Sequence, residues 1–421
     1  MRTAEDKLAE AVGLARAIDL QVVDDLVVPL GRVTPATYLG AGKVEELKGR
    51  IAALDADLVV VDAALSPVQQ RNLERAWQAK VLDRTGLILE IFGERAATRE
   101  GRLQVELAYL NYQKSRLVRS WTHLERQRGG LGAVGGPGET QIEADRRMIR
   151  ERIARLEKQL DTVRRTRELH RESRRKVPYP VVALVGYTNA GKSTLFNALT
   201  QSDVFAEDLL FATLDPTMRG LELPDGRTAI LSDTVGFISD LPLHLIAAFR
   251  ATLEEVVEAD LILHVRDMSA EDASVQARDV TRVLQELGID ADRRDRVIEV
   301  WNKIDLLDDD ERRSLVEQAR RMQGRVVTVS ATTGEGLDEL RHAIAQHLDR
   351  DTRELEVTLR PDQGKAINWF YENGAVLERL DLEDGSLVQL RVRMPTHKLD
   401  AALAKFDTAR PVPEHESRMA G

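Results

Sequence analysis

The nine residues 186–194, Gly-Tyr-Thr-Asn-Ala-Gly-Lys-Ser-Thr, constrain the fold more than any other stretch of the chain. They separate an apolar run at 181–185, which predicts a buried parallel strand, from a segment that predicts a helix beginning near Lys192. Gly186 and Gly191 let the backbone curl so that successive N–H groups point at phosphate oxygens. The Lys192 side chain suits the β- and γ-phosphates, and the Ser193 hydroxyl suits Mg²⁺. The helix N-terminus adds partial positive charge, so this stretch predicts a phosphate-binding loop.

Two short motifs downstream have the chemistry that such a loop needs. Phe-Ala-Thr-Leu-Asp at 211–215 offers the hydroxyl of Thr213 as a second metal ligand. Asp-Thr-Val-Gly at 233–236 follows an apolar run, as expected of a strand that delivers the Asp233 carboxylate to the magnesium shell. Gly236 then provides a backbone N–H that can contact a γ-phosphate and move when that phosphate leaves.

Asn-Lys-Ile-Asp at 302–305 predicts the choice of base. The Asp305 carboxylate can accept two hydrogen bonds from N1–H and N2–H₂ of guanine, a donor pair that adenine lacks. Asn302 suits the acceptor edge of the base, and the aliphatic stem of Lys303 can lie along the purine face. Ser-Ala-Thr at 330–332 is a weaker fifth motif. Together the motifs predict a domain that binds and hydrolyses GTP with Mg²⁺.

Phe237, directly after Gly236, stands where small GTPases carry the glutamine that orients the attacking water. A phenyl ring has no polar atom for this role, so no catalytic side chain is assigned; Lys192 would only stabilise phosphate charge. We expect slow hydrolysis by the isolated protein and acceleration by a partner. The alternative is that Asn189 or Thr234 replaces the glutamine.

Composition sets the outer limits. A chain of 421 residues with 43% hydrophobic residues predicts two to four domains with substantial cores. The chain has no cysteine, which excludes disulfides and thiolate metal sites, and its eight histidines show no metal-binding spacing. The first ten residues are charged and the apolar runs have strand length, so we expect a cytoplasmic monomer with no transmembrane segment. Peripheral membrane association stays open.

Charge is distributed unevenly along the chain. The net charge is −10, yet residues 95–176 contain 21 Lys and Arg against 11 Asp and Glu. An acidic protein with one concentrated basic region is typical of a molecule that meets nucleic acid at a single place.

The basic region predicts two helices. Apolar residues recur at helical spacing from Leu103 to Leu124 and again from Ile142 to Val163, and Thr140 with Glu143 forms a capping box. The ten residues between them, 129–138, include six glycines that would leave the tip of an antiparallel hairpin nearly free of side chains. One interpretation is an arm whose tip enters an RNA site, with contacts from Gly129, Gly130, Gly132, Gly135, Gly136 and Gly138. The other is a plain two-helix spacer with solvated basic faces.

The remaining segments complete an α/β architecture. We expect an N-terminal α/β domain at 1–100, the helical hairpin at 101–176 and a P-loop domain with a mostly parallel sheet flanked by helices at 177–350. A small α+β domain follows at 355–421, with a hairpin strand that alternates from Val388 to Met394. The basic, proline-containing segment 174–180 would join the arm to the P-loop domain as a stiff linker.

Several of these stretches resemble the HflX family of GTPases. The similarity rests on LQVELAYL at 103–110, WTHLER at 121–126, GGPGETQIEADRR at 135–147 and the nucleotide motifs GYTNAGKST, FATLDPT and DTVGF. GAGKVEELK at 40–48, LSPVQQRNLER at 65–75 and VLDRTGLILEIF at 81–92 are similar to the N-terminal domain of the same family. The resemblance implies a GTPase that binds the large ribosomal subunit, reaches toward the peptidyl transferase centre with its hairpin, and splits stalled ribosomes, especially under heat stress.

The resemblance also implies a set of nucleotide contacts, with Ser193 and Thr213 as ligands of Mg²⁺. The implied GTP-binding residues are Gly186, Tyr187, Thr188, Asn189, Ala190, Gly191, Lys192, Ser193, Phe211, Ala212, Thr213, Leu214, Asp215, Asp233, Thr234, Val235, Gly236, Asn302, Lys303, Ile304, Asp305, Ser330, Ala331 and Thr332. We expect a switch in which GTP orders the segments around Thr213 and Gly236 and so sets the posture of the arm. The competing hypothesis is an RNA-binding or assembly factor that uses GTP only as a structural ligand.

Overall fold

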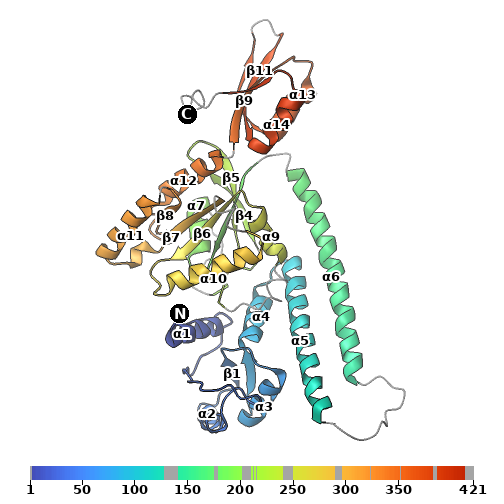
Figure 1. Ribbon diagram of the computed structural model, residues 1–421, viewed down its shortest axis with the longest axis vertical. Helices are drawn as coiled ribbons and strands as arrows, with labels where there is room; N and C mark the ends of the chain where they lie inside the picture. Colours follow the sequence, from blue (N-terminus) through green and yellow to red (C-terminus); the bar gives the residue numbers. More distant parts are fainter. Residues whose placement is uncertain are drawn as a thin grey trace.

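The computed structural model describes residues 2–127, 141–174, 179–201, 210–211, 213–214, 216–239, 250–289, 296–322, 324–350, 352–382 and 386–412. Within these ranges the strands form sheets of two, six and four strands. Each sheet belongs to a different unit along the chain, and two long helices run beside the first two units (Figure 1). The molecule is therefore elongated, with the six-stranded unit in the middle.

The N-terminal unit is a small α/β arrangement. Its parallel strands β1 and β2 pair over four residues, and Ser66 accepts a hydrogen bond from the backbone of Gln69 at 3.2 Å at the start of α3. Pro67 occupies the first turn of α3, where its missing N–H costs nothing. The elements are α1 (Ala4–Arg16), α2 (Ala41–Ala53), β1 (Leu58–Val61), α3 (Pro67–Trp77), β2 (Lys80–Asp83) and α4 (Arg84–Arg95).

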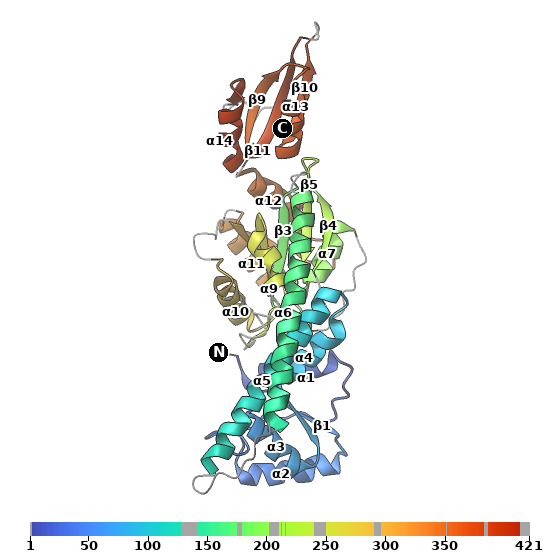
Figure 2. The same cartoon turned by 90° about the vertical axis from the view of Figure 1, so that its right-hand side faces the viewer.

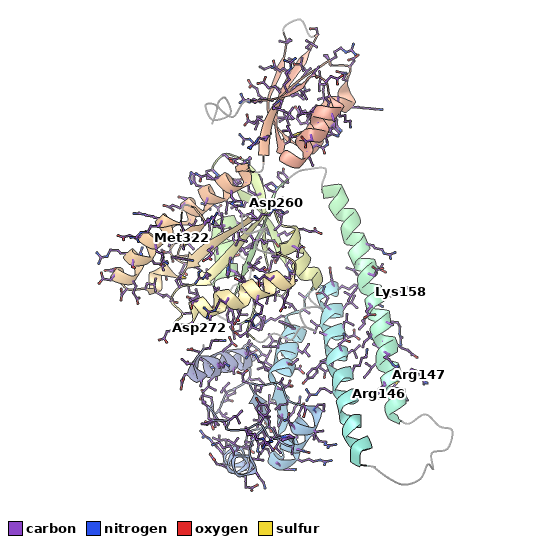
Figure 3. All side chains as sticks on the ribbon, in the orientation of Figure 1. Arg146, Arg147, Lys158, Asp260, Asp272 and Met322 are labelled. Carbon is purple, nitrogen blue, oxygen red and sulfur yellow. The ribbon has the colours of Figure 1, made fainter. Side chains whose placement is uncertain are left out.

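The two long helices are α5 (Arg99–Gln127) and α6 (Gln141–Arg174), which run antiparallel to each other (Figure 2). Ala108 on α5 and Leu156 on α6 are fully buried, and Arg152 forms an ion pair with Glu106 across the two helices at 2.6 Å. Arg147 and Lys158 are exposed on α6 (Figure 3). The predicted glycine-rich tip, and Thr140 of the predicted capping box, lie outside the described residues.

The central unit is a doubly covered sheet with the order β4-β5-β3-β6-β7-β8, in which only β4 is antiparallel to its neighbour. Successive residues of β3 face opposite layers: Leu184 packs with α7 and α12, and Val185 packs with α9 and α10. The elements are β3 (Val181–Gly186), α7 (Lys192–Thr200), β4 (Thr217–Glu222), β5 (Thr228–Asp233), α9 (Arg250–Glu258), β6 (Leu261–Asp267), α10 (Ala273–Glu286), β7 (Val297–Asn302), the 3₁₀ turn η2 (Ile304–Leu306), α11 (Asp309–Arg321), β8 (Val326–Thr328) and α12 (Leu337–Arg350). This is the predicted P-loop fold.

The C-terminal unit is an antiparallel sheet with the order β10-β11-β9-β12. Along β11 the apolar residues from Val388 to Met394 are buried in alternation, as the sequence predicted, and Arg391 contacts Glu354 on β9. The elements are β9 (Thr352–Leu359), α13 (Gly364–Asn373), β10 (Ala375–Asp381), β11 (Val388–Pro395), α14 (Thr396–Lys405) and β12 (Ala409–Pro411).

Candidate nucleotide site

The loop between β3 and α7 has the tight curvature that a phosphate-binding loop requires. Gly191 has φ +87°, and a methyl group there would overlap the side-chain amide of Asn302. A methyl group at Gly186 would overlap the backbone carbonyl oxygen of Val265 on the neighbouring strand. Close packing therefore requires both glycines, and the positive φ of Gly191 is a second reason for glycine at that position.

Lys192 lies at the centre of this loop and is buried. Its Nζ donates hydrogen bonds to the carbonyl oxygens of Tyr187 at 2.8 Å and Gly186 at 3.3 Å. Burial lowers the pKa of this amine to about 8, against the opposing attraction of the Asp233 carboxylate. An anion that enters the loop would provide a counter-charge for this buried ammonium and so stabilise its protonated form.

Three oxygen-bearing side chains converge beside the lysine. The hydroxyls of Ser193 and Thr213 are 2.8 Å apart, and both donate to Oδ2 of Asp233, at 2.7 and 2.9 Å. Burial raises the pKa of Asp233, while the Ser193 hydrogen bond and the Lys192 charge work in the opposite direction. Within the part of the chain that the structure describes, Oδ1 of Asp233 is buried and accepts no hydrogen bond. A buried carboxylate oxygen without a donor fits a cation site, because Mg²⁺ prefers oxygen ligands.

The segment after Asp233 folds back onto the phosphate loop. Phe237 donates from its backbone N–H to the carbonyl oxygen of Gly186 at 3.0 Å, and its own carbonyl accepts from the N–H of Thr188 at 2.7 Å. A Cβ on Gly236 would lie only 3.0 Å from Nζ of Lys192. The backbone of Gly236 is therefore in contact with the lysine that is expected to hold the phosphates.

The side chains near Gly236 bear on which residue could orient the attacking water in place of the missing glutamine. The Phe237 ring is 2% exposed and packs into an apolar cluster that includes Ile88 of the N-terminal unit. Thr234 is fully buried, and its hydroxyl donates to the carbonyl oxygen of Leu184 at 2.5 Å. In this conformation the Thr234 hydroxyl is therefore engaged with the backbone, whereas Asn189 is exposed in the loop with φ 60°.

Asn302 connects the predicted base-selecting motif to the other loops. Its Nδ2 donates to the carbonyl oxygen of Ala190 at 2.9 Å, and its Oδ1 accepts from the N–H of Ala331 at 3.0 Å. Lys303 pairs with Asp267 at 2.8 Å, and Asp305 is exposed on η2. Three loops that are distant in the sequence thus meet at one end of the parallel strands, which is where open α/β sheets bind ligands.

Some predicted contact residues have other surroundings. Phe211, Leu214 and Val235 are buried among apolar side chains, and Ser330 accepts a hydrogen bond from the backbone N–H of Thr333. Ile304 is also buried, while Thr332 is exposed. Ala212, Asp215 and the glycines of the hairpin tip lie outside the described residues.

One set of contacts beside the loop was not predicted. The Tyr187 hydroxyl donates to Glu10 on α1, and Ser239 contacts both Tyr187 and Arg84 of the N-terminal unit. Single polar residues without periodic spacing carry no pattern from which such a cluster could be predicted.

Other classes of site find little support. Across the described ranges, no three His, Cys, Asp or Glu side chains are grouped as a metal site, and no helix there has the length and apolarity to cross a bilayer. His264 on β6 is buried, and burial lowers its pKa to about 4, so this imidazole is neutral at pH 7.

Four protein-family models match the chain in succession. They are described as GTP-binding GTPase N-terminal (residues 5–93), GTP-binding GTPase Middle Region (95–174), 50S ribosome-binding GTPase (181–303) and HflX C-terminal domain (314–410). The first two cover the N-terminal unit and the long helices, and the others cover the central and C-terminal units.

Relatives of known name extend over nearly the whole chain. The GTPase HflX of Magnetococcus marinus is 53% identical over 377 residues, which cover 90% of this chain and 86% of that protein. The GTPase HflX of Escherichia coli is 47% identical over 361 residues, covering 86% and 83%. Among solved structures, the complex of SsGBP with GDP is 25% identical, covers 82% of this chain and 96% of that one, and has a TM-score of 0.49. By the identity and coverage of its named relatives, the chain belongs to the HflX family of GTPases, enzymes that hydrolyse GTP.

Proposed function

We propose that this protein is a Mg²⁺-dependent GTP switch that binds the large ribosomal subunit and dissociates stalled ribosomes in the cytoplasm. The family model over 181–303 is described as a 50S ribosome-binding GTPase, which supports the choice of partner. We also propose four working units, at 1–100, 101–176, 177–350 and 355–421.

The observation that carries the nucleotide part is the convergence of Ser193, Thr213 and Asp233 beside the buried Lys192. These oxygens fit Mg²⁺, and we propose that Ser193 and Thr213 would hold the ion, with Asp233 in support. The bound ion would neutralise charge on the β- and γ-phosphates. Lys192 would bind the same phosphates, and Asp305 would select guanine from its exposed position on η2.

The long helices support an RNA-binding role. Arg147, Arg150 and Lys158 are exposed along α6, where they can neutralise phosphates of ribosomal RNA. Arg147 and Lys158 are labelled in Figure 3. In the proposed cycle, GTP orders the segments around Thr213 and Gly236 and favours the arm posture that binds the ribosome. Hydrolysis, stimulated by the ribosome, then releases the protein.

Sedimentation of intact ribosomes tests this function. We expect subunit release with GTP and with a non-hydrolysable GTP analogue, and no release with GDP. Charge reversal at Arg147 and Arg150 should abolish release, whereas reversal of the exposed Arg313 on α11 is the matched control.

Hydrolysis measured with and without purified large subunits gives the second criterion. Stimulation by the large subunit supports the switch. Equal ribosome binding in the GTP and GDP states, without subunit release, would instead identify a passive assembly or RNA-binding factor.

A further inference from the structure

Glu10 on α1 lies between the N-terminal and central units and is 9% exposed. Its carboxylate accepts a hydrogen bond from Nη1 of Arg2 at 2.6 Å and from the Arg84 guanidinium, and it also accepts from the hydroxyl of Tyr187. Tyr187 is the second residue of the phosphate loop. The N-terminal unit therefore holds the loop through a buried hydrogen bond to a carboxylate that is itself ion-paired, and loss of a partner at such a site has a large effect.

Arg84 also holds the segment that follows Gly236. Its Nη2 donates to the backbone carbonyl of Ser239 at 2.9 Å, and the N–H of Ser239 donates to the Tyr187 hydroxyl at 2.8 Å. Ser239 comes only three residues after Gly236, so a movement of this segment must change its contacts with Arg84.

Apolar contacts reinforce the same junction. Phe92 on α4 packs edge-to-face against Phe211 with 4.8 Å between ring centroids. Phe237 and Ile238 belong to the same buried cluster. Helix α4 thus contacts both segments that are expected to respond to the γ-phosphate.

Asp83, the residue directly before Arg84, makes its contacts in another direction. Its carboxylate is 2% exposed and accepts hydrogen bonds from the Tyr112 hydroxyl at 2.8 Å and from Nη1 of Arg116 at 3.1 Å, both on α5. It also caps α4 by accepting from the N–H of Gly86 at 2.8 Å. Figure 1 shows α4 and α5 adjacent at this point.

We propose that the dipeptide Asp83–Arg84 transmits the nucleotide state to the long helices, with Arg84 positioning Ser239 and Tyr187 and Asp83 positioning α5. This inference rests on the proposed function only in assigning a nucleotide-dependent posture to the arm. It places the route through the N-terminal unit and not through the stiff linker predicted at 174–180. Asp83 caps α4 and Arg84 is the first residue of that helix, so both belong to one helix start and a displacement of that start changes the contacts of both.

The direction of coupling follows from the described conformation. Thr213 is already beside Ser193 and Asp233, which is the arrangement that a bound triphosphate and Mg²⁺ would favour. The contacts of Arg84 and Asp83 belong to that same arrangement. Loss of these contacts should therefore weaken binding of a non-hydrolysable GTP analogue more than binding of GDP.

The decisive experiment measures the affinity ratio of the GTP analogue to GDP in variants of the full chain, without ribosomes. Tyr112→Phe removes one hydroxyl on α5, and Tyr109→Phe, on the same helix and 41% exposed, is its control. Arg84→Gln removes the other connection, and Arg50→Gln is its control, because Arg50 is exposed and, among the ion pairs of the described residues, pairs only with the half-buried Asp24. Thermal unfolding verifies that each variant is folded.

We expect the ratio to fall about fivefold or more in Tyr112→Phe and Arg84→Gln and to stay at the wild-type value in both controls. An unchanged ratio in folded Tyr112→Phe overturns the proposal, even if Arg84→Gln has an effect, because the arm would then be uncoupled. Should Arg84→Gln fail to fold, Tyr112→Phe alone decides. Because no ribosome is present, the result is independent of whether the protein splits ribosomes.

A distance measurement gives a second readout. The chain has no cysteine, so Lys158→Cys on α6 and Met322→Cys at the end of α11 would carry two unique labels (Figure 3). The label separation should differ between GDP and the analogue in the wild-type background, and the difference should disappear with Tyr112→Phe. A difference that persists in that variant contradicts the proposal.

Discussion

Asn302 donates a hydrogen bond from its side-chain amide to the backbone carbonyl of Ala190 at 2.9 Å, which joins the base-selecting motif directly to the phosphate loop. The two ends of a bound nucleotide would therefore lie on one connected structure. The side-chain oxygen of Asn302 also accepts a hydrogen bond from the backbone N–H of Ala331, so the position of the loop at 330–332 depends on the same residue.

Replacement of this side chain should weaken both nucleotides equally. Asn302→Ala removes the two hydrogen bonds that hold the loops together, and their loss should reduce the free energy of nucleotide binding by about 1–3 kcal/mol. We expect GTP and GDP affinities to fall about 5- to 150-fold together in titration calorimetry. Asn72→Ala, which removes a comparable amide-to-carbonyl bond in the N-terminal unit, should leave both affinities unchanged.

Base selection should be separable from this effect. In Asp305→Asn the side-chain amide can donate to the additional oxygen of xanthine, so affinity for XTP should rise while affinity for GTP falls. Competition between the two nucleotides measures the change. Retention of the GTP preference by the variant would show that Asp305 does not contact the base.

Gly186 should tolerate no side chain. A methyl group there meets the backbone carbonyl of Val265, which cannot move aside as a side chain could. Gly186→Ala should lower the free energy of unfolding by about 1–3 kcal/mol or more, measured by urea denaturation. Gly220→Ala on β4 is the control, because the nearest neighbour of the added methyl group would be the Thr228 methyl at 3.5 Å. Equal stability of the two variants would show that the close contact at Gly186 has no energetic cost.

GTP affinity should depend on pH through Lys192. Its pKa of about 8 in the nucleotide-free protein means that the ammonium is lost above that pH, and with it the attraction for phosphate. We expect a nearly constant affinity below pH 7 and a decline above pH 8 that approaches tenfold per pH unit. Since the ordinary value is 10.5, the unfolded chain binds more protons between pH 8 and 10.5. This lysine therefore makes the nucleotide-free protein more stable as the pH rises through that range.

Calorimetry between pH 6.5 and 9 measures the affinity. In Lys192→Arg the guanidinium does not titrate in this range. We therefore expect this variant to bind GTP more weakly, but with a smaller loss of affinity as the pH rises. Identical pH profiles for the two proteins would exclude Lys192 as the titrating group.

Intrinsic hydrolysis should be slow. The Phe237 ring is buried against the N-terminal unit, and the Thr234 hydroxyl is bonded to Leu184, so neither can orient water in this conformation. Single-turnover rates of the isolated protein should lie at or below about 10⁻⁴ s⁻¹, comparable to unassisted small GTPases. A rate near 1 s⁻¹ without any partner would refute this expectation.

The features that were predictable from sequence are those set by local chemistry. The curvature around Gly191, the buried strand before Gly186 and the alternation from Val388 to Met394 follow from backbone sterics and from period-two burial. The convergence of Ser193 with Thr213 was predictable because both residues belong to motifs whose ligand is chemically defined.

The contacts between units were not predictable. Glu10 and Tyr187 are 177 residues apart, and nothing in either neighbourhood marks the other as its partner. Asp83 looks like an ordinary helix cap, yet it also accepts hydrogen bonds from α5. Such pairings depend on how whole units pack, which no single stretch of sequence specifies.

The length of α6 has a mechanical consequence. With 34 residues the helix measures about 51 Å at 1.5 Å of rise per residue. A tilt of about 5° at one end of a rod this long displaces the other end by about 4 Å, which exceeds the length of a hydrogen bond. Sub-ångström adjustments around a phosphate can thus be amplified, by simple geometry, into motions large enough to make or break contacts with another macromolecule.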